Sequence, residues 1–269
     1  MKRINVLILL LVVLIVAGLG VTVVYRVRDV ANAIKCQNNL HQIGIALQGY
    51  HDATGHFPSA TVRNAVLPPE KRLSWTPELW PCFMEGGYRS LLNPKEAWDS
   101  KENYPDRCLV RIDDRGNMRE ESIGEMPSFR CPGNPNSDSS DTVSPTDYVG
   151  IAGVGEAAAK LPLFDPRAGF FGYDRQITFK DIKDGTANTM AVTEVLDGGP
   201  WTAGGYATVR GLAADARPYL GKGGQFTPLH LETNVLFADA SVRSFTSALP
   251  REVFEAMATI AGGEKADAD

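Results

Sequence analysis

Residues 4–55 read INVLILLLVVLIVAGLGVTVVYRVRDVANAIKCQNNLHQIGIALQGYHDATG, and this stretch decides the fold. No charged residue falls between Arg3 and Arg26. A helix over residues 4–25 would be roughly 30 Å long, which matches the hydrocarbon core of a bilayer. The run is longer than the apolar core of a cleaved signal peptide and has a poor cleavage site. The sequence therefore predicts a transmembrane helix over residues 4–25, after a cytoplasmic stub at residues 1–3.

The helical pattern continues beyond Arg26. Apolar residues recur at spacings of about three and four, with polar residues between them. They are Val27, Val30, Ala31, Ile34, Leu40, Ile43, Ile45 and Leu47. Gly55 followed by Pro58 is typical of a helix end. We therefore expect one long helix whose second half, residues 26–55, is amphipathic and packs on a soluble domain.

Glycine and proline cluster after this helix, which predicts a loop-rich domain with short strands over residues 56–262. The clearest strand pair is a β-hairpin over Asn234–Phe245, where two apolar flanks enclose turn residues. We also expect strands over 148–152, 189–196 and 108–112, a strand ending at 129–132, an irregular stretch over 198–224, a closing helix over 247–260 and a disordered tail at 263–269. The predicted fold class is α+β, with the long helix packed on a small antiparallel sheet that carries long loop insertions.

The net charge and the cysteines limit the classes of function that can be expected. The net charge is −5 and no basic stripe is present, which excludes nucleic acid as an expected partner. The four cysteines form no C-x-x-C pair and lie at no zinc-like spacing from histidine, so no metal site is expected. An even count in an anchored, loop-rich domain suits two disulfides in an oxidising compartment, and we favour Cys36–Cys131 and Cys82–Cys108. Four buried, reduced thiols are the alternative.

Ordered motifs run along nearly the whole chain. They are residues 36–47, 50–52, 55–58, 73–75, 97–100, 129–132, 181–189, 235–242 and 256–264. In this order they resemble bacterial prepilin-like (pseudopilin-like) proteins that carry a C-terminal domain of unknown function, often marked by a His-x9-Asp-Gly motif. The resemblance implies a pilin-like fold, with the soluble domain on the extracytoplasmic side of the bacterial inner membrane and a single membrane pass. It also implies partners among other pilin-like subunits or components of type II secretion or type IV pilus-like systems, reached through the N-terminal helix.

Two departures from that family separate this chain from a fibre subunit. Asn5 stands about where the family has the glutamate that pairs with a neighbour's terminal amine, and no glycine precedes it for cleavage. His230 and Asp239 have eight residues between them instead of nine, and Ala240 replaces the glycine of the motif, although a tight turn often needs a positive φ. The resemblance therefore implies an accessory role in assembly rather than a major fibre subunit.

No nucleophile motif accompanies the four histidines, so we expect no enzyme activity and no cofactor. His51 beside Asp52 is more typical of a packed helix end than of a general base. A group of carboxylates around a turn offers a weak calcium site: Asp181, Asp184, Glu194 and Asp197. His230 with Asp215 and Asp239 is a weaker cation candidate.

An alternative function is a membrane-tethered module that binds an extracytoplasmic ligand such as a glycan. The tryptophans at positions 75, 80, 98 and 201 could stack on sugar rings, although their proline-broken context favours packing in the core. A hydrolase with an unrecognised site is a third possibility. An exposed tryptophan patch would favour the binding module, and clustered titratable residues in a pocket would favour the hydrolase.

Overall fold

A computed structural model describes residues 2–83, 88–90, 92–103, 109–112, 118–121, 127–134, 144–215 and 218–263, with the side chains of 2–17, 19–21, 88–90, 109–112 and 118–121 left outside that description. Its elements, in chain order, are α1 (Lys2–Thr54), η1 (Pro69–Lys71), η2 (Thr76–Leu79), α2 (Trp80–Phe83), β1 (Tyr88–Ser90), β2 (Leu109–Ile112), β3 (Met118–Glu121), η4 (Pro127–Phe129), β4 (Tyr148–Val154), η5 (Ala158–Lys160), η6 (Phe179–Asp181), β5 (Met190–Glu194), η7 (Gly205–Ala207), β6 (Val209–Leu212), β7 (Thr233–Phe237), β8 (Val242–Phe245) and α3 (Arg251–Met257). The fold is α+β, as predicted.

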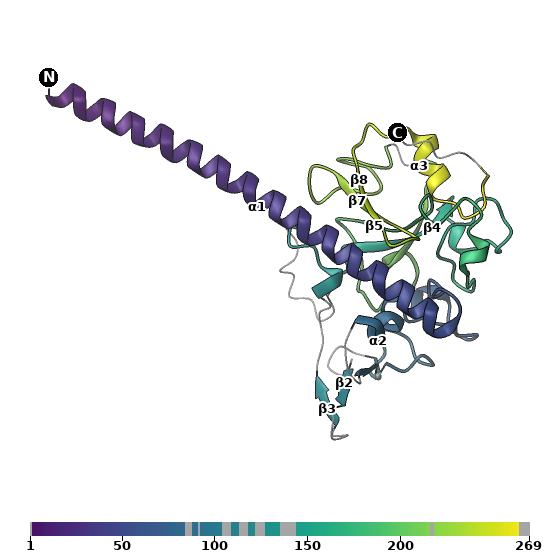
Figure 1. The fold of residues 1–269 in the computed structure, drawn as a ribbon. Coiled ribbons are helices and arrows are strands. Elements are labelled where there is room, and N and C mark those ends of the chain that lie inside the picture. The colour runs from purple at the N-terminus through teal and green to yellow at the C-terminus, as the bar shows by residue number, and fades with distance from the viewer. Residues whose placement is uncertain are drawn as a thin grey trace.

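The helix α1 dominates the molecule with 53 residues. Its N-terminal half extends away from the rest of the chain, and its C-terminal half lies along the domain (Figure 1). Gly55, at φ +84°, ends it, and its N–H donates to the carbonyl of His51 at 2.7 Å. Glycine adopts this left-handed conformation without the steric cost that a Cβ brings, so the predicted helix end is confirmed.

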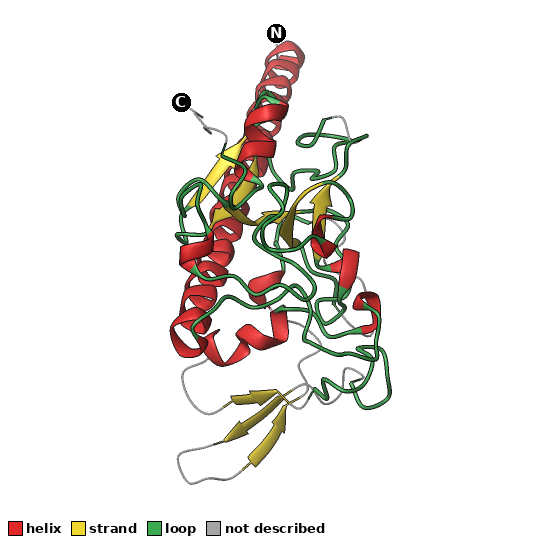
Figure 2. Ribbon diagram, turned by 90° about the vertical axis from the view of Figure 1, so that its right-hand side faces the viewer, coloured by secondary structure: helices red, strands yellow, loops and turns green. Residues whose placement is uncertain are grey.

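Five strands form the main sheet in the order β6-β4-β5-β7-β8. Four of the five strands are linked by antiparallel pairing, but β4 and β6 are parallel, so the predicted antiparallel sheet is in fact mixed. The strand β6 lies inside the glycine-rich stretch that we expected to be irregular, so that expectation is wrong for these residues. A strand of four residues is too short to show a clear alternation of apolar and polar side chains. A separate antiparallel sheet of β1, β2 and β3 stands apart from it (Figure 2).

The other predicted strands and the closing helix are confirmed only in part. The strands predicted over 148–152, 189–196 and 108–112 are present as β4, β5 and β2. The strand expected to end at 129–132 is wrong, because Pro127–Phe129 forms a 3-10 helix and prolines at both ends of the segment remove backbone donors. The closing helix is shorter than predicted, beginning at Arg251 and ending at Met257.

The sheet separates two cores. On one face, Leu40, Ile43 and Leu47 of α1 pack with residues that include Leu236 and Trp75. On the other, residues of α3 pack with the opposite faces of the same strands: Val149, Val235, Phe237, Phe254 and Met257. Val235 and Phe237 on one side and Leu236 on the other follow the two-residue alternation of a strand. This sandwich of α1, sheet and α3 fixes α1 relative to the domain.

The docked part of α1 is shorter than the amphipathic pattern predicted. Burial begins at Cys36, whereas Val27, Val30 and Ile34 are 63%, 58% and 53% exposed. Their spacing is helical, but the domain does not reach them. The apolar face that we expected to pack on the domain from residue 26 is therefore solvent-exposed in its first ten residues or so.

No helix is long and apolar enough to cross a membrane within the part of the chain whose side chains are described. Most side chains of the predicted span, residues 4–25, lie outside that part, as does the side chain of Asn5.

A disulfide joins Cys36 of α1 to Cys131, which confirms the first predicted pair. Cys82 is a free cysteine, which contradicts the predicted Cys82–Cys108 bond, and Cys108 itself lies outside the described residues. Cysteine counts suggest disulfides but cannot assign them, because pairing depends on Cα distances that only the fold sets.

The predicted hairpin is confirmed as β7 and β8, which pair antiparallel. Ala240 in its turn has φ +67°, so the chain keeps the turn that the family motif fills with glycine and places an alanine in the left-handed region. The Cβ of Ala240 also lies against α1 at Gly44, where an added Cβ would stand 2.9 Å from it and 2.8 Å from Cδ1 of Leu236.

We expect Ala240→Gly to stabilise the protein by about 1 kcal/mol, because it relieves a left-handed residue that carries a Cβ. Gly44→Ala is expected to destabilise it by about 2 kcal/mol, because the new methyl group overpacks the contact between α1 and the hairpin. The double variant should be more stable than the sum of the two single changes in the free energy of unfolding predicts, because Ala240→Gly removes one of the atoms that the new methyl group at residue 44 would clash with. Urea unfolding followed by circular dichroism measures all three, and additive values would contradict this contact.

Candidate functional site

Four chemically distinctive side chains meet where α1 crosses the sheet. Cys36 comes from α1, Cys131 follows η4, Glu194 ends β5 and His230 precedes β7. Each offers one ligand atom, and all four atoms lie within 4.8 Å of one another. We call these four residues the cystine–histidine cluster. Among the described residues it is the one group of three or more such side chains that is close enough to hold a metal ion.

His230 stands directly over the disulfide. Its Nε2 lies 3.2 Å from Sγ of Cys36 and 3.2 Å from Sγ of Cys131. Its side chain is only 3% exposed, and its Nδ1 lies 3.5 Å from Oδ1 of Asp29, which belongs to α1. Nδ1 has no hydrogen-bond partner within the described part of the chain. The imidazole is therefore buried, with one nitrogen on the sulfurs and the other facing a carboxylate at the limit of hydrogen bonding.

Glu194 is fully buried on the same side of the sheet. Its Oε2 accepts a hydrogen bond from the backbone N–H of Asn234, and its Oε1 accepts one from Nδ2 of Asn234, both at 2.9 Å. Burial raises the pKa of Glu194 to about 7, and these two hydrogen bonds oppose that rise. A carboxyl group with such a pKa is poised between its neutral and charged forms near neutral pH.

Gly133 makes room for the imidazole. A Cβ at this position would stand 2.4 Å from Cε1 of His230, far inside van der Waals contact. A side chain at residue 133 would therefore push His230 away from the disulfide.

A protein-family model described as "Protein of unknown function (DUF1559)" matches residues 26–219, which is more than half of the chain. The chain belongs to this family. The match includes Cys36, Cys131 and Glu194, and it ends before His230. This DUF1559 protein matches no curated protein and no solved structure.

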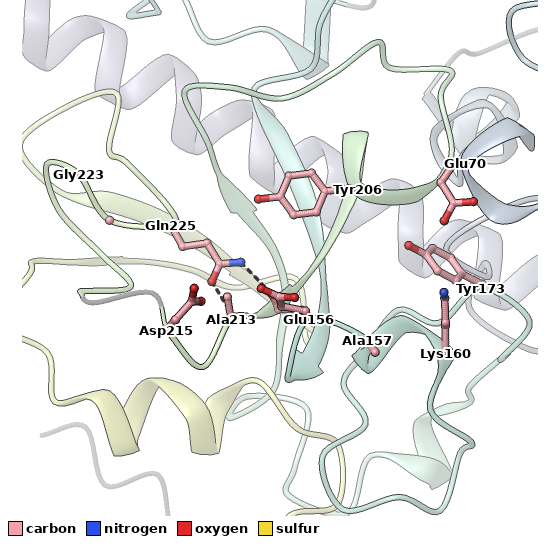
Figure 3. A pocket seen from close by; sticks show the side chains of 12 residues that line it. Glu70, Glu156, Ala157, Lys160, Tyr173, Tyr206, Ala213, Asp215, Gly223 and Gln225 are labelled. Carbon is pink, nitrogen blue, oxygen red and sulfur yellow. Dashed lines mark hydrogen bonds between the residues drawn. The ribbon is translucent and has the colours of Figure 1, made fainter.

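A cleft of about 740 Å³ in this DUF1559 protein lies away from the cystine–histidine cluster and is lined by residues of η1, η5, η7, β6 and nearby loops. Figure 3 shows Glu70, Lys160 and Tyr173 at one end and Asp215 and Gln225 at the other, with Tyr206 between them. Gln225 is fixed, because its Nε2 donates to the carbonyl of Gly211 at 2.8 Å and its Oε1 accepts from the N–H of Ala213 at 2.9 Å. The cleft therefore presents aromatic rings beside carboxylates, an amide and an ammonium group.

The aromatic rings of the cleft differ in burial. Tyr206 is 60% exposed, and the guanidinium of Arg210 lies 4.4 Å from the centre of its ring. Tyr173 is half-buried, and burial and then the charge of Glu70 raise its pKa. An exposed ring held by a cation is suited to stacking on a ligand.

The four tryptophans do not form a ligand platform. Trp75, Trp80 and Trp201 are at most 3% exposed and belong to the core, which confirms the packing interpretation. Trp98 is half-buried, and its Nε1 donates to the carbonyl of Glu70 at 3.0 Å. His51 likewise packs at the helix end, between the rings of Phe57 and Phe179.

The calcium candidates have separate structural partners. Oδ2 of Asp181 accepts from the N–H and Oγ1 of Thr178, which caps η6. Asp184 accepts from the N–H groups of Gly262 and Gly263 and holds the C-terminal segment. Of the other two predicted ligands, Asp197 pairs with Arg210 at 2.8 Å and Glu194 belongs to the cystine–histidine cluster. The structure therefore gives the four predicted calcium ligands different structural partners.

His230 and Asp239, the counterparts of the family's His-x9-Asp-Gly motif, also lie apart in the structure. His230 precedes β7 and Asp239 follows it, so the whole strand lies between them. Asp239 accepts hydrogen bonds from the N–H and Oγ of Ser241 and shapes the hairpin turn. Asp215, the third member of that candidate set, lines the cleft instead. Sequence reasoning placed His230 with the wrong partners, because its neighbours Cys36 and Cys131 are 194 and 99 residues away along the chain.

Proposed function

We propose that this protein is a non-enzymatic, membrane-anchored assembly protein of pseudopilin type. In this proposal the N-terminal half of α1 is the single membrane span of a bacterial inner-membrane protein, and the domain stands on the extracytoplasmic side. The observation that carries the proposal is the continuity of α1, which is docked rigidly at one end and free at the other (Figure 1).

The docked end of α1 is held by polar contacts as well as by its core. Nε2 of Gln48 donates to the carbonyl of Ala238 at 2.7 Å, and Nδ2 of Asn39 donates to the carbonyl of Arg130 at 2.7 Å. Nε2 of Gln37 donates to Oδ1 of Asn234 at 3.2 Å. With the disulfide, these contacts hold the helix direction relative to the sheet. A pilin-like subunit needs this rigidity, since its helix sets how the domain sits on the membrane.

The free end supports a contact surface for other helices. Val27, Val30 and Ile34 are more than half exposed, and they continue from the apolar run that precedes Arg26. A row of apolar residues that the domain leaves uncovered is typical of a surface for another helix or for lipid. We propose that other pilin-like subunits or secretion-system components pack there, and that Asn5 makes this chain an accessory component rather than a fibre subunit.

The full chain is expected to stay in the membrane fraction after an alkaline carbonate wash, whereas a chain that lacks residues 2–21 is expected to be soluble and folded. Intact mass of the membrane-bound form should give a chain that begins at Met1 or Lys2.

A matched variant, Val27→Ser with Ile34→Ser, tests the contact surface and should remain in the membrane but lose cross-links to neighbouring helices. A chain that begins near residue 20 and fractionates with soluble protein would contradict the anchor. A methylated terminus near Ile4 would instead support a processed fibre subunit.

A second candidate function rests on the cleft around Tyr206. Its aromatic and carboxylate groups suit a polar ligand such as a glycan, although three of the four tryptophans first considered for stacking are buried. The two functions make different predictions. Binding of a soluble glycan that is lost in Tyr206→Ala, and kept when residues 2–21 are absent, would favour the binding module over the assembly protein.

A further inference from the structure

The cystine–histidine cluster has the ligand types of a zinc site. We propose that, in the dithiol form of the chain, Cys36, Cys131, His230 and Glu194 bind one zinc ion. Thiolate, imidazole and carboxylate are the three protein ligands that zinc takes in tetrahedral sites. The four atoms that would bind come from α1, the segment after η4, β5 and the segment before β7, so the ion would join α1 to the sheet.

The geometry around Nε2 of His230 fits this role. In a tetrahedral site with bonds of about 2.0 Å to nitrogen and about 2.3 Å to sulfur, the nitrogen and each sulfur lie about 3.5 Å apart. Nε2 is already 3.2 Å from both sulfur atoms. The imidazole therefore needs to move by only a few tenths of an ångström in relation to each sulfur. The carboxylate of Glu194 completes the group, with all four atoms within 4.8 Å of one another.

Neighbouring groups hold the ligands in place. A histidine that binds zinc usually presents its other nitrogen to a carboxylate, and Nδ1 of His230 faces Asp29 at 3.5 Å. Glu194 is oriented by two hydrogen bonds from Asn234, one to each oxygen, which leaves lone pairs for a metal.

The disulfide and the metal exclude each other. Reduction of the Cys36–Cys131 bond by a dithiol reductant uses two electrons and two protons and converts the reductant to its own disulfide. Zinc then displaces the two thiol protons and binds the thiolates. Reoxidation by a disulfide oxidant, which takes up the two electrons and two protons from solvent and becomes its dithiol, breaks both sulfur–zinc bonds and releases the ion as the Cys36–Cys131 disulfide forms. The oxidised and dithiol forms therefore alternate between a covalent link and a metal link at the same position.

Cobalt titration of the full chain in detergent tests the site. The experiment uses a Cys82→Ser, Cys108→Ser background, so that Cys36 and Cys131 are the remaining thiols. The metal is added to the folded, oxidised protein before a phosphine reductant, so that the dithiol forms inside the native fold. We expect about one cobalt ion per chain, with the intense visible bands of a tetrahedral site and a thiolate charge-transfer band, and displacement by zinc. The oxidised protein should bind none.

Substitutions assign the ligands. His230→Gln and Glu194→Gln should each weaken cobalt binding by more than about 10-fold, and Asp29→Asn, a positioning residue, by roughly 10-fold. The matched controls are His41→Gln, at an exposed histidine of α1, and Glu78→Gln, at a half-buried carboxylate in η2. Neither control should change the affinity, and circular dichroism confirms that each variant folds.

Three results would overturn the proposal. One is a reduced chain, folded or not, that retains no metal. Another is cobalt binding without the thiolate charge-transfer band. The third is an affinity that is the same in His230→Gln or Glu194→Gln as in the parent protein.

Discussion

Removal of the disulfide by Cys36→Ala with Cys131→Ala is expected to lower the free energy of unfolding by about 4–5 kcal/mol. The two cysteines are 95 residues apart in sequence, and a link across a loop of this length restricts the unfolded chain strongly. Both positions are fully buried, and alanine adds no polar group at either of them. Urea unfolding followed by the fluorescence of the buried tryptophans measures the loss.

Cys82→Ala is the matched control for that change. Cys82 is a free, half-buried cysteine, so its replacement should cost less than about 1 kcal/mol. A similar cost for the control and the double variant would contradict the stabilising role of the bond. Zinc added to the reduced wild-type chain should recover part of the loss, because a ligand that binds the folded form alone stabilises it by mass action.

Glu78→Gln is expected to stabilise the protein by about 3 kcal/mol at pH 8 and to have little effect at pH 4. Burial raises the pKa of Glu78 in the folded protein to about 7, from 4.5 in the unfolded chain. Between these values the folded chain holds the proton more tightly, so stability falls as pH rises from about 4.5 to above 7, by about 1.4 kcal/mol for each pKa unit. Glutamine stays neutral and still accepts the hydrogen bond that the Tyr50 hydroxyl donates to Oε1 of Glu78 at 3.3 Å.

The free energy of unfolding measured in urea between pH 4 and pH 9 tests this prediction. Part of the slope should remain in Glu78→Gln, because burial raises the pKa of Glu194 in the same direction. Glu96→Gln, at an exposed position, is the matched control and should leave the slope unchanged. A slope that is equally steep in wild type and Glu78→Gln would contradict a buried, titrating Glu78.

The regular parts of the fold were predictable because their signals are local. The repeat of Leu40, Ile43 and Leu47 identifies the docked face of α1, and the alternation in Asn234–Phe245 identifies the hairpin. The four residues of β6 carry no such signal, and their parallel pairing with β4 depends on a connection that sequence patterns do not encode. Where the docked face begins was also beyond prediction, since Val27 and Ile34 follow the same spacing as the buried residues.

The candidate site was predictable only in pieces. Spacing of cysteine and histidine along the chain excluded a metal site, because known zinc motifs place their ligands close together in sequence. Here the proposed ligands come from four distant segments, and only the packing of α1 on the sheet at β7 and β8 brings them together. The Cys36–Cys131 pair was predicted correctly, but no local pattern links it to His230 or Glu194.

The position of the disulfide also decides which parts of the chain carry tension. For a protein held by its N-terminal helix and pulled at its other end, the force passes along α1 to Cys36 and crosses directly to Cys131. The intervening segment, about 340 Å of contour length at roughly 3.6 Å per residue, carries no load while the bond is intact. That segment includes Trp75 and much of the core beneath α1. Reduction would add this hidden length to the load-bearing chain, so the redox state of one bond sets how far the protein can be stretched.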